Sequence, residues 1–509
     1  MSVLKTISKN IFSNYVGIGG AIIIAFLLSP YLIHTLGDTR YGVWSVVSAL
    51  TGYMSLLDLG ISSAVAKYVA KHKALNDYKA INVVIGSSLV VLMSVALLLI
   101  LVSPVLANGM VSFFDFDGEL GRTVHALIIV ASIDIAIFVC TGVLMGAYFG
   151  FQRFEVTNAV NLTVGIFKAL AFYLALSNGL GLFAMGVVSL LGNILAALLL
   201  FGTMRKLEPE VKLQPQAADK KTIKTIYNYS KYTFISMLAM QLVYYSDAFV
   251  IGYFLTAAAI TIYTIPWSLS EYTNKLILAI AQTFVPVFSD QDATQGNQAI
   301  YQTYVTGTKF MLVVSNLLCI GVLAVGDHFV NLWMGPKYAV ECSVILSFLF
   351  VTQLIKGPQL LSYSILLGTA NHERYSLYNF CFSLLNLFLS IVLVQQYGLV
   401  GVAMGTAFTQ IMFFGIFTPI LTSKVINSSL VDYFKRTYLR MLPSSILLFV
   451  LLKYFSSVKT PESYTVLLLQ ALAAAVVYLI SVYFILLDKD EKKIVSAGMG
   501  KVVDKVLKR

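Results

Sequence analysis

The chain consists of long apolar stretches separated by short polar segments, and this pattern recurs from one end of the sequence to the other. A helix crosses a membrane with ~20 mostly apolar residues, whereas a spanning β-strand needs only ~10 residues of alternating character. The stretches here are of the longer kind and do not alternate, so they predict membrane-spanning helices. Fourteen spans are predicted: Ile11–His34, Tyr41–Ala66, Val83–Ala107, Val124–Phe149, Val156–Ser177, Leu180–Phe201, Thr233–Phe254, Ala257–Phe288, Val305–Val325, Cys342–Leu367, Leu377–Val394, Val400–Leu421, Tyr438–Phe455 and Tyr464–Leu487.

The predicted fold class is therefore an all-α polytopic membrane protein with about 14 transmembrane helices. Of the 509 residues, 58% are hydrophobic and 12% are charged, the latter about half the share in soluble proteins. This composition excludes an ordinary soluble enzyme, a disordered chain and a disulfide scaffold. The sequence has no Walker loop, zinc-ligand spacing or nucleophile elbow. No catalytic residue, metal or cofactor is predicted, and the chain is not expected to be an enzyme.

The 35 basic residues outnumber the 24 acidic ones and give a net charge of +11. If the N-terminus is inside, most of the basic residues fall in the inner segments and few in the outer loops. This is the bias that cytoplasmic loops of membrane proteins show, so both termini are predicted to be cytoplasmic. The same bias explains the positive charge without a nucleic-acid partner.

The two halves of the sequence resemble each other. Ser8–Phe12 recurs as Ser230–Phe234, and Gly179-Leu180 recurs as Gly398-Leu399 at nearly the same offset. The matches extend over six spans, an even number, so they predict two pseudo-symmetric lobes in one orientation, a parallel repeat. The predicted parts are an N-terminal six-helix lobe at 1–204, a cytoplasmic linker at 205–228, a C-terminal six-helix lobe at 229–423, helices 13 and 14 at 424–487, and a cytoplasmic amphipathic tail at 488–509.

Charged and polar residues inside the predicted spans are the candidate functional groups, because a charge at mid-bilayer is costly unless it faces a cavity or a partner. Glu271 and Lys275 lie four residues apart on one helix face. They form either a self-neutralised pair or a cavity pair in which Lys275 exchanges Glu271 for a phosphate oxygen. Lys356 precedes Gly357-Pro358, which predicts a broken helix at a site or a kink needed only for packing. The candidate substrate-binding residues are Lys275, Glu271, Lys356, Trp267, Arg40 and Gln241.

A second group of intramembrane charges is suited to coupling or gating. Asp134, Asp247 and Lys168 lie near the middle of their spans, where a carboxylate can bind a proton or a sodium ion or can pair with a lysine. Asp58 lies toward the cytoplasmic end of span 2, where it either gates or packs against an inner-loop lysine. Arg40, at the outer end of the same span, adds a basic group on the release side or binds lipid headgroups.

Short motifs in the first two spans are characteristic of one family: Ser29-Pro30-Tyr31-Leu32, Leu36-Gly37, Tyr41-Gly42-Val43-Trp44, Leu56-Leu57-Asp58-Leu59-Gly60 and Ala64-Val65-Ala66-Lys67-Tyr68. With them the chain resembles the polysaccharide transport family, whose members include the bacterial O-antigen flippases. That family shares a superfamily with the lipid II flippases and the multidrug and toxin extrusion antiporters. The resemblance covers essentially the whole chain, and the plan of six, six and two spans matches the flippase branches.

The resemblance implies translocation of an undecaprenyl-pyrophosphate-linked oligosaccharide from the cytoplasmic to the periplasmic leaflet of the bacterial inner membrane, by alternating access, for surface polysaccharide biosynthesis. It also implies contact with membrane lipids and other glycan-assembly proteins as partners. The driving force is left open between a gradient of H⁺, a gradient of Na⁺ and the membrane potential. The family has cationic groups for the pyrophosphate, but no motif here fixes their positions. One alternative is a cation-coupled multidrug antiporter, although span 1 lacks the acidic residue of that branch. The other is a membrane polysaccharide polymerase or ligase, for which the outer loops are too short.

Overall fold

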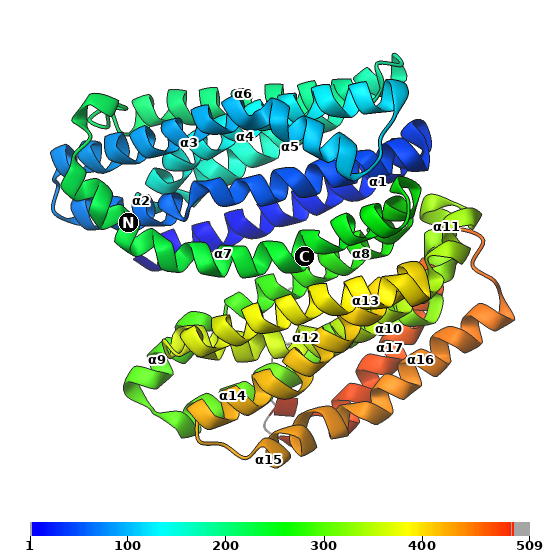
Figure 1. Ribbon diagram of the computed structural model, residues 1–509. Coiled ribbons are helices and arrows are strands. Elements are labelled where there is room, and N and C mark those ends of the chain that lie inside the picture. The colour runs from blue at the N-terminus through cyan, green and yellow to red at the C-terminus, as the bar shows by residue number, and fades with distance from the viewer. Residues whose placement is uncertain (1–2, 490, 493–509) are drawn as a thin grey trace, which may run out of the picture. The chain divides into compact units, whose positions relative to one another are not determined.

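The computed structural model describes residues 3–489 and 491–492, and these are almost wholly helical (Figure 1). The α-helices are α1 (Val3–Met54), α2 (Ile61–Ala74), α3 (Tyr78–Phe113), α4 (Gly118–Gly150), α5 (Phe154–Ser177), α6 (Gly181–Leu207), α7 (Lys220–Phe254), α8 (Ala257–Gln282), α9 (Val285–Thr294), α10 (Asn297–Met334), α11 (Pro336–Glu341), α12 (Ser343–Gly368), α13 (His372–Met412), α14 (Thr418–Val425), α15 (Leu430–Phe434), α16 (Arg440–Val458) and α17 (Tyr464–Ile485).

In the described part of the chain, ten helical stretches are long and apolar enough to cross a membrane. The stretch of 42 residues covers most of predicted spans 1 and 2, and the stretch of 53 residues contains spans 11 and 12. The gaps between these spans contain Gly37 and Gly398. Both glycines have positive φ, a conformation that interrupts a helix and that glycine adopts without strain. Helices α7 and α8 form where spans 7 and 8 are predicted, but they are not among the ten. The all-α membrane fold is confirmed, whereas the number of fourteen spans and the repeat stay predictions.

The chain divides into two compact units. The first comprises Met1–Thr264 and Ser383–Val402, and the second comprises Ile265–Phe382 and Ala403–Arg509. Within the first unit, α7 packs against α1, α2 and α3. The division follows packing, whereas the predicted lobes follow the sequence repeat, so the predicted lobe boundaries stay a prediction.

A row of glycines on α4 determines how closely α2 packs against α4 in the core of the first unit. Gly142, Gly146 and Gly150 recur every four residues and face α2. A Cβ atom at Gly146 would lie 2.4 Å from the backbone oxygen of Ser62, and one at Gly150 would lie 2.7 Å from that of Ala66. The missing side chains let the two backbones approach closely, as small residues do in membrane helix pairs. Because of this contact, the start of α2 lies directly against α4.

The segment between α6 and α7 is bound to the first unit along its length. The buried carboxylate of Glu208 accepts hydrogen bonds from Lys73 at 3.2 Å and from Arg153 at 3.4 Å. The side chain of Asn82 on α3 accepts a hydrogen bond from the backbone N–H of Lys212 at 2.8 Å. This segment, which lies within the predicted linker, is therefore ordered and hydrogen-bonded to α3.

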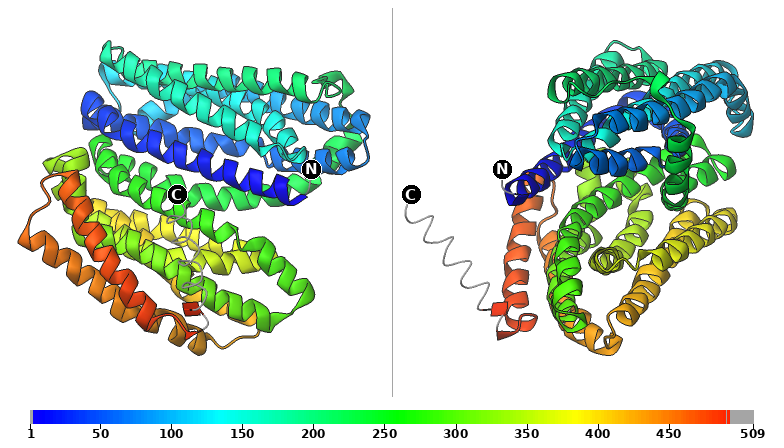
Figure 2. Two further views of the ribbon diagram at one scale, coloured as in Figure 1. Left: turned by 180° about the vertical axis from the view of Figure 1, so that it is seen from behind. Right: turned by 90° about the vertical axis from the view of Figure 1, so that its left-hand side faces the viewer.

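In the second unit, α10 and α12 pack against each other, and α16 and α17 pack against α10. The two last helices, orange and red, lie side by side in Figure 1 and in the left view of Figure 2. Their contact with α10 buries Leu312, Leu448 and Tyr478. The Tyr478 hydroxyl donates to the backbone oxygen of Val313 at 3.3 Å. The last two helices are thus joined to α10 by an apolar core.

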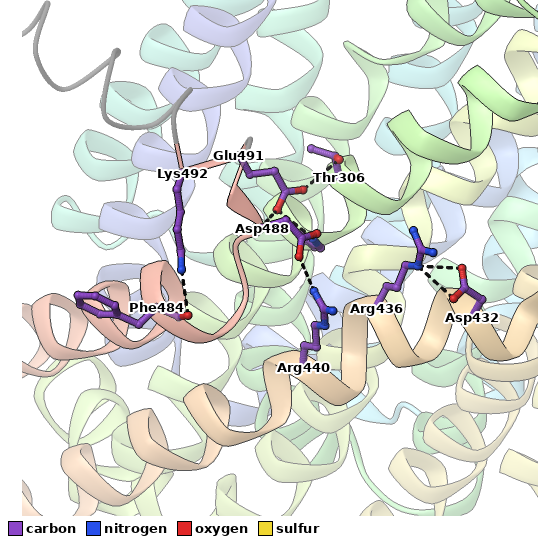
Figure 3. A network of polar contacts seen from close by, with 9 residues as sticks. Thr306, Asp432, Arg436, Arg440, Phe484, Asp488, Glu491 and Lys492 are labelled. Atoms are coloured by element: carbon purple, nitrogen blue, oxygen red, sulfur yellow. Dashed lines mark hydrogen bonds and ion pairs between the residues drawn. The ribbon is translucent and has the colours of Figure 1, made fainter.

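An ion-pair network fastens the chain after α17 to the same unit (Figure 3). Lys309 of α10, only 2% exposed, lies 2.7 Å from Asp488 and 2.9 Å from Glu491. Arg440, the first residue of α16, lies 2.6 Å from Asp488. The network therefore connects α10, α16 and the segment after α17. Residues 493–509, with most of the predicted amphipathic tail, lie outside the described residues.

Removing the buried Lys309 ammonium tests how much this network contributes to the stability of the fold. We expect Lys309→Met to lower the free energy of unfolding by about 3 kcal/mol, because Glu491 loses its partner while largely buried. Thermal unfolding of the purified full-length chain in detergent measures the change. Lys424→Met, at an exposed lysine on α14, is the matched control, with a change within about 0.5 kcal/mol. Equal effects of the two variants would contradict this assignment.

The pH dependence of the network follows from Asp488. The hydrogen bond from Lys309, with a further one from Arg440, holds the pKa of Asp488 below its ordinary value. A carboxyl group whose pKa is lowered by folding stabilises the fold above its ordinary pKa and loses that effect as the pH falls through the folded value. The melting-temperature difference between the wild type and Asp488→Asn should therefore stay constant down to about pH 4 and shrink below it. A difference already lost near neutral pH would contradict this, and Glu462→Gln, at an exposed carboxylate, is the control.

Candidate functional site

Three of the predicted substrate-binding residues form one charged cluster in the second unit. Glu271 and Lys275 lie one turn apart on α8, with the ammonium 4.0 Å from the carboxylate. Lys356 on α12 is half-buried, and the charge of Glu271 acts on it. Its ammonium also lies 5.4 Å from the centre of the Phe414 ring, within cation–π range. Two lysines thus lie within electrostatic reach of one carboxylate, and only Lys275 is within ion-pair distance of it.

Exposure differs sharply within the cluster. The Lys275 side chain is 51% exposed, whereas that of Glu271 is 15% exposed. The separation of 4.0 Å is longer than that of a hydrogen-bonded ion pair, so the contact between these two residues is a loose one. Little free energy is therefore needed for Lys275 to exchange Glu271 for another anion.

Helices α8, α10 and α12 also bring uncharged polar groups together beside this cluster. Gln353 of α12 donates hydrogen bonds to the backbone oxygen and the hydroxyl of Ser270 on α8, at 3.2 Å and 3.0 Å. Three buried atoms of these helices have no hydrogen-bond partner within the described structure: Asn274 Oδ1, Ser315 Oγ and Gln353 Oε1. Unpaired buried polar atoms are unfavourable by about 1–3 kcal/mol each. The three helices therefore enclose a polar region whose buried acceptors are not all satisfied within the described structure.

Helix packing explains part of the sequence Lys356-Gly357-Pro358. A Cβ atom at Gly357 would lie 2.6 Å from the Ser315 hydroxyl of α10, so the glycine permits close contact between α10 and α12. Pro358 lies inside α12 and removes one backbone donor. Helix packing therefore accounts for Gly357, while Lys356 is the residue of this motif that belongs to the charged cluster.

The other predicted substrate-binding residues occupy different positions. Trp267 is half-buried on α8, one turn before Glu271 and directly after Pro266. Gln241 belongs to the first unit, where its amide donates to the Ser55 hydroxyl at 2.9 Å and ties α7 to the turn after α1. Arg40 is exposed beyond the kink at Gly37 in α1. The structure thus brings Glu271, Lys275 and Lys356 together, and Arg40 and Gln241 are residues of the first unit.

Asp58 has a structural function that its position in the sequence does not reveal. Its carboxylate accepts hydrogen bonds from the backbone N–H of Ser62, at 3.3 Å, and from the Ser62 hydroxyl. Ser62 lies in the first turn of α2, whose N–H groups have no partner within the helix. Asp58 therefore caps α2 where that helix meets the row of glycines on α4.

Asp247 is a buried carboxylate held by three helices of the first unit. Tyr263 of α8 donates to it at 2.6 Å, and Ser390 of α13 donates to it at 3.4 Å. Neither Tyr263 nor Ser390 is singled out by the sequence, because the three residues lie on separate helices. Asp247 thus remains a candidate for proton or sodium binding, and Tyr263 and Ser390 are its hydrogen-bond donors.

Asp134 and Lys168 are joined through a residue that sequence reasoning missed. Asn193 of α6 donates to Asp134 of α4 at 2.6 Å and accepts a hydrogen bond from Lys168 of α5 at 3.1 Å. Asp134 and Lys168 are therefore linked through the Asn193 amide and not by a direct ion pair. A polar residue in an apolar span was the available signal for Asn193.

The sequence pattern of the polysaccharide biosynthesis protein family matches residues 7–291, more than half of the chain. This chain belongs to that family. Two curated relatives of this family member cover most of its length. "Probable low-salt glycan biosynthesis flippase Agl15" of Haloferax volcanii is 24% identical over 80% of this chain and 81% of its own. "Putative O-antigen transporter" of Shigella flexneri is 20% identical over 81% of this chain and 96% of its own.

Solved structures show the same fold for this member of the polysaccharide biosynthesis family. The inward closed lipid II flippase MurJ matches 92% of this chain and 97% of its own, with a TM-score of 0.74 and 14% identity. An inward-facing multidrug resistance transporter of the MATE family matches 81% of this chain and 96% of its own, with a TM-score of 0.70 and 13% identity. These similarities show that the chain has the fold that these two membrane proteins share.

The capping function of Asp58 can be separated from a gating function by two substitutions. We expect Asp58→Ala to lower the free energy of unfolding by about 1 kcal/mol, whereas Asp58→Asn, which keeps a side-chain acceptor, changes it little. Thermal unfolding in detergent provides the measurement. A gate that needs the negative charge would instead leave Asp58→Asn inactive in the host despite its normal stability.

Proposed function

We propose that this chain is a flippase that moves an undecaprenyl-pyrophosphate-linked oligosaccharide from the cytoplasmic to the periplasmic leaflet of the bacterial inner membrane. The observation that supports this most directly is the cluster of Lys275, Lys356 and Glu271, in which two lysines lie near one carboxylate. Membership of the polysaccharide biosynthesis family and relatives named as flippase and O-antigen transporter agree with it. These relatives favour a transporter rather than an enzyme.

The cluster supplies the chemistry that a pyrophosphate requires. Ammonium groups donate charge-assisted hydrogen bonds to phosphate oxygens, and such bonds are about twice as strong as neutral ones. Because the Glu271–Lys275 contact is long, at 4.0 Å, Lys275 can leave Glu271 for a phosphate oxygen. When the lipid headgroup departs, Glu271 neutralises Lys275 again. The pair thus favours binding and still permits release.

The neighbouring polar groups are suited to binding the sugars. Gln353, Asn274 and Ser315 provide acceptor atoms without partners within the described structure, and Trp267 offers an aromatic face on the same helix as Lys275. Aromatic rings and hydrogen-bonding side chains suit an amphiphilic glycan better than a purely apolar drug. Arg40 and Gln241 are further candidates for the substrate path.

The transport cycle follows from the fold class. We propose alternating access, with the lipid tail in the bilayer, both termini in the cytoplasm and other glycan-assembly proteins as partners. Asp247 is the candidate for coupling to H⁺ or Na⁺, because its buried carboxylate is the group whose charge such an ion would neutralise. A cation-coupled multidrug antiporter is the second candidate, favoured by the fold shared with the MATE transporter.

Deletion in the native host separates the two functions. We expect loss of surface glycan and accumulation of the intact lipid-linked oligosaccharide on the inner leaflet, measured by glycan staining and by extraction of the lipid pool. Normal surface glycan with raised sensitivity to cationic drugs would contradict the flippase and favour the antiporter.

Rescue of the deletion tests the cluster. Lys275→Met and Lys356→Met should each fail to restore surface glycan fully, because loss of a charge-assisted hydrogen bond worth about 1.5–3 kcal/mol weakens binding about 10- to 100-fold. Lys275→Arg, which keeps the charge, should restore it more fully than Lys275→Met. Lys453→Met, at an exposed lysine of α16, is the control. Full rescue by both cluster variants would contradict the assigned site.

A further inference from the structure

The helix that begins with α15 continues into α16 through a π-helical turn, Lys435–Leu439. A π turn closes with i→i+5 hydrogen bonds, holds one residue more than an α turn and is rare. Residues five positions apart are about 140° apart around an α-helix, whereas a π turn brings them to one side. Tyr433 and Tyr438 are five positions apart across this turn, so the π turn lets both face the same neighbour.

That neighbour is a buried amide of α12. Gln359 Nε2 donates hydrogen bonds to the Tyr433 hydroxyl at 3.1 Å and to the Tyr438 hydroxyl at 2.9 Å. Gln359 Oε1 accepts from the Ser362 hydroxyl at 2.7 Å, which fixes the orientation of the amide. An amide nitrogen has two N–H donors, and both are used only while the two tyrosines face α12 together. The amide of Gln359 therefore matches the π turn and does not match an α turn of the same residues.

Tyr433 is held by contacts with other elements as well. Its ring stacks on that of Tyr304 of α10, with centroids 4.4 Å apart and planes 7° apart. The hydroxyl of Thr308, also on α10, lies 3.3 Å from the Tyr433 hydroxyl. Within the turn, the Thr437 hydroxyl donates to the backbone oxygen of Tyr433 at 2.6 Å, a bond that competes with the regular helical pattern. These contacts stabilise the widened turn from both sides.

The π turn also decides whether two polar contacts can form on one helix. Before the turn, Asp432 accepts a hydrogen bond from the Tyr301 hydroxyl of α10 at 2.6 Å. After the turn, Arg440 lies 2.6 Å from Asp488 (Figure 3). If the same residues formed an α turn, one end of the helix would rotate by about 100° against the other, and one of these contacts would break.

We propose that the π turn Lys435–Leu439 is a register switch in the second unit, and that the Gln359 amide holds it in the π state. In this state α15 and α16 both keep their polar contacts. In the other state the turn is α-helical, and either α15 or α16 is rotated by one residue. Gln359 lies one turn after Lys356 on α12, so the switch contacts the helix that carries a candidate substrate-binding lysine. The switch itself does not depend on whether the chain flips glycolipids.

The test measures distances between spin labels in the purified full-length chain in detergent. The exposed Cys381 and the half-buried Cys140 are replaced by alanine, and the other two cysteines are buried. One label is attached at Phe310→Cys on α10, and the second at Val431→Cys on α15 or at Ile446→Cys on α16. All three labelled positions are exposed. Each pair therefore reports the rotation of one end of the helix against α10.

Replacing the amide should change the register of the turn. We expect Gln359→Leu to shift one of the two distances by up to about 8 Å, because a side chain about 5–6 Å from the helix axis rotates through about 100°. Gln396→Leu, at an exposed glutamine of α13, is the matched control and should shift neither distance. Two unchanged distances in folded Gln359→Leu would overturn the proposal.

A deletion decides whether such a shift is one of register. Removing the exposed Lys435 takes the extra residue out of the turn, and an α turn then leaves Tyr433 and Tyr438 four positions apart on one face. Both distances should therefore return to their wild-type values in Gln359→Leu that also lacks Lys435. A shift that persists after the deletion would contradict the switch, because it would come from loosened packing instead.

The deletion of Lys435 alone covers the case in which Gln359→Leu does not fold. This variant should keep both distances and unfold near the wild-type temperature, because the helix on each side of the turn keeps its phase. Deletion of Val450, exposed in the regular part of α16, is the matched control. It should lower the melting temperature, because it rotates Leu452 out of the core with α10. Equal losses of stability in the two deletion variants would contradict the proposal.

Discussion

The constraint on which this structure depends is that a charge inside a membrane must have a partner or a cavity. Apolar stretches supply the driving force for spanning, but the charged residues decide which helices must lie together. Lys309 joins α10 to the segment after α17, and the pair of Asp134 and Lys168 joins α4, α5 and α6. In both places one buried polar group connects elements that are far apart in the sequence.

Glycine acts beside this constraint by permitting the contacts that the charges require. The row of glycines on α4 brings α2 close enough for Asp58 to lie near Gly142, and Gly192 lets Lys168 reach Asn193. In each case the small residue and the polar group are adjacent. Close backbone approach and polar pairing are therefore two parts of one packing solution, as expected where hydrophobic burial cannot drive helix association.

The sequence was sufficient for the fold class because hydropathy is a local property. The positions of Gly37 and Gly398 also agree with the gaps between predicted spans, since a positive φ interrupts a helix wherever it occurs. Partners of buried charges were not predictable in the same way. Asn193 and Glu491 lie 25 and 182 residues from the lysines they contact, and no periodicity relates them. For Asp58 the sequence suggested a lysine or a gate, whereas the partner in the structure is Ser62 in the following turn.

Exposure explains why similar lysines are suited to different tasks. Lys309 is 2% exposed and contacts two carboxylates, so removing it leaves the largely buried Glu491 without a cation. Lys275 is 51% exposed with one shared carboxylate, so water or a phosphate can replace Glu271 with little change in free energy. A transporter needs both kinds of contact, because its helices must stay assembled while its substrate must leave. The intramembrane charges of this chain therefore divide by their exposure into those that hold the fold and those that can exchange partners.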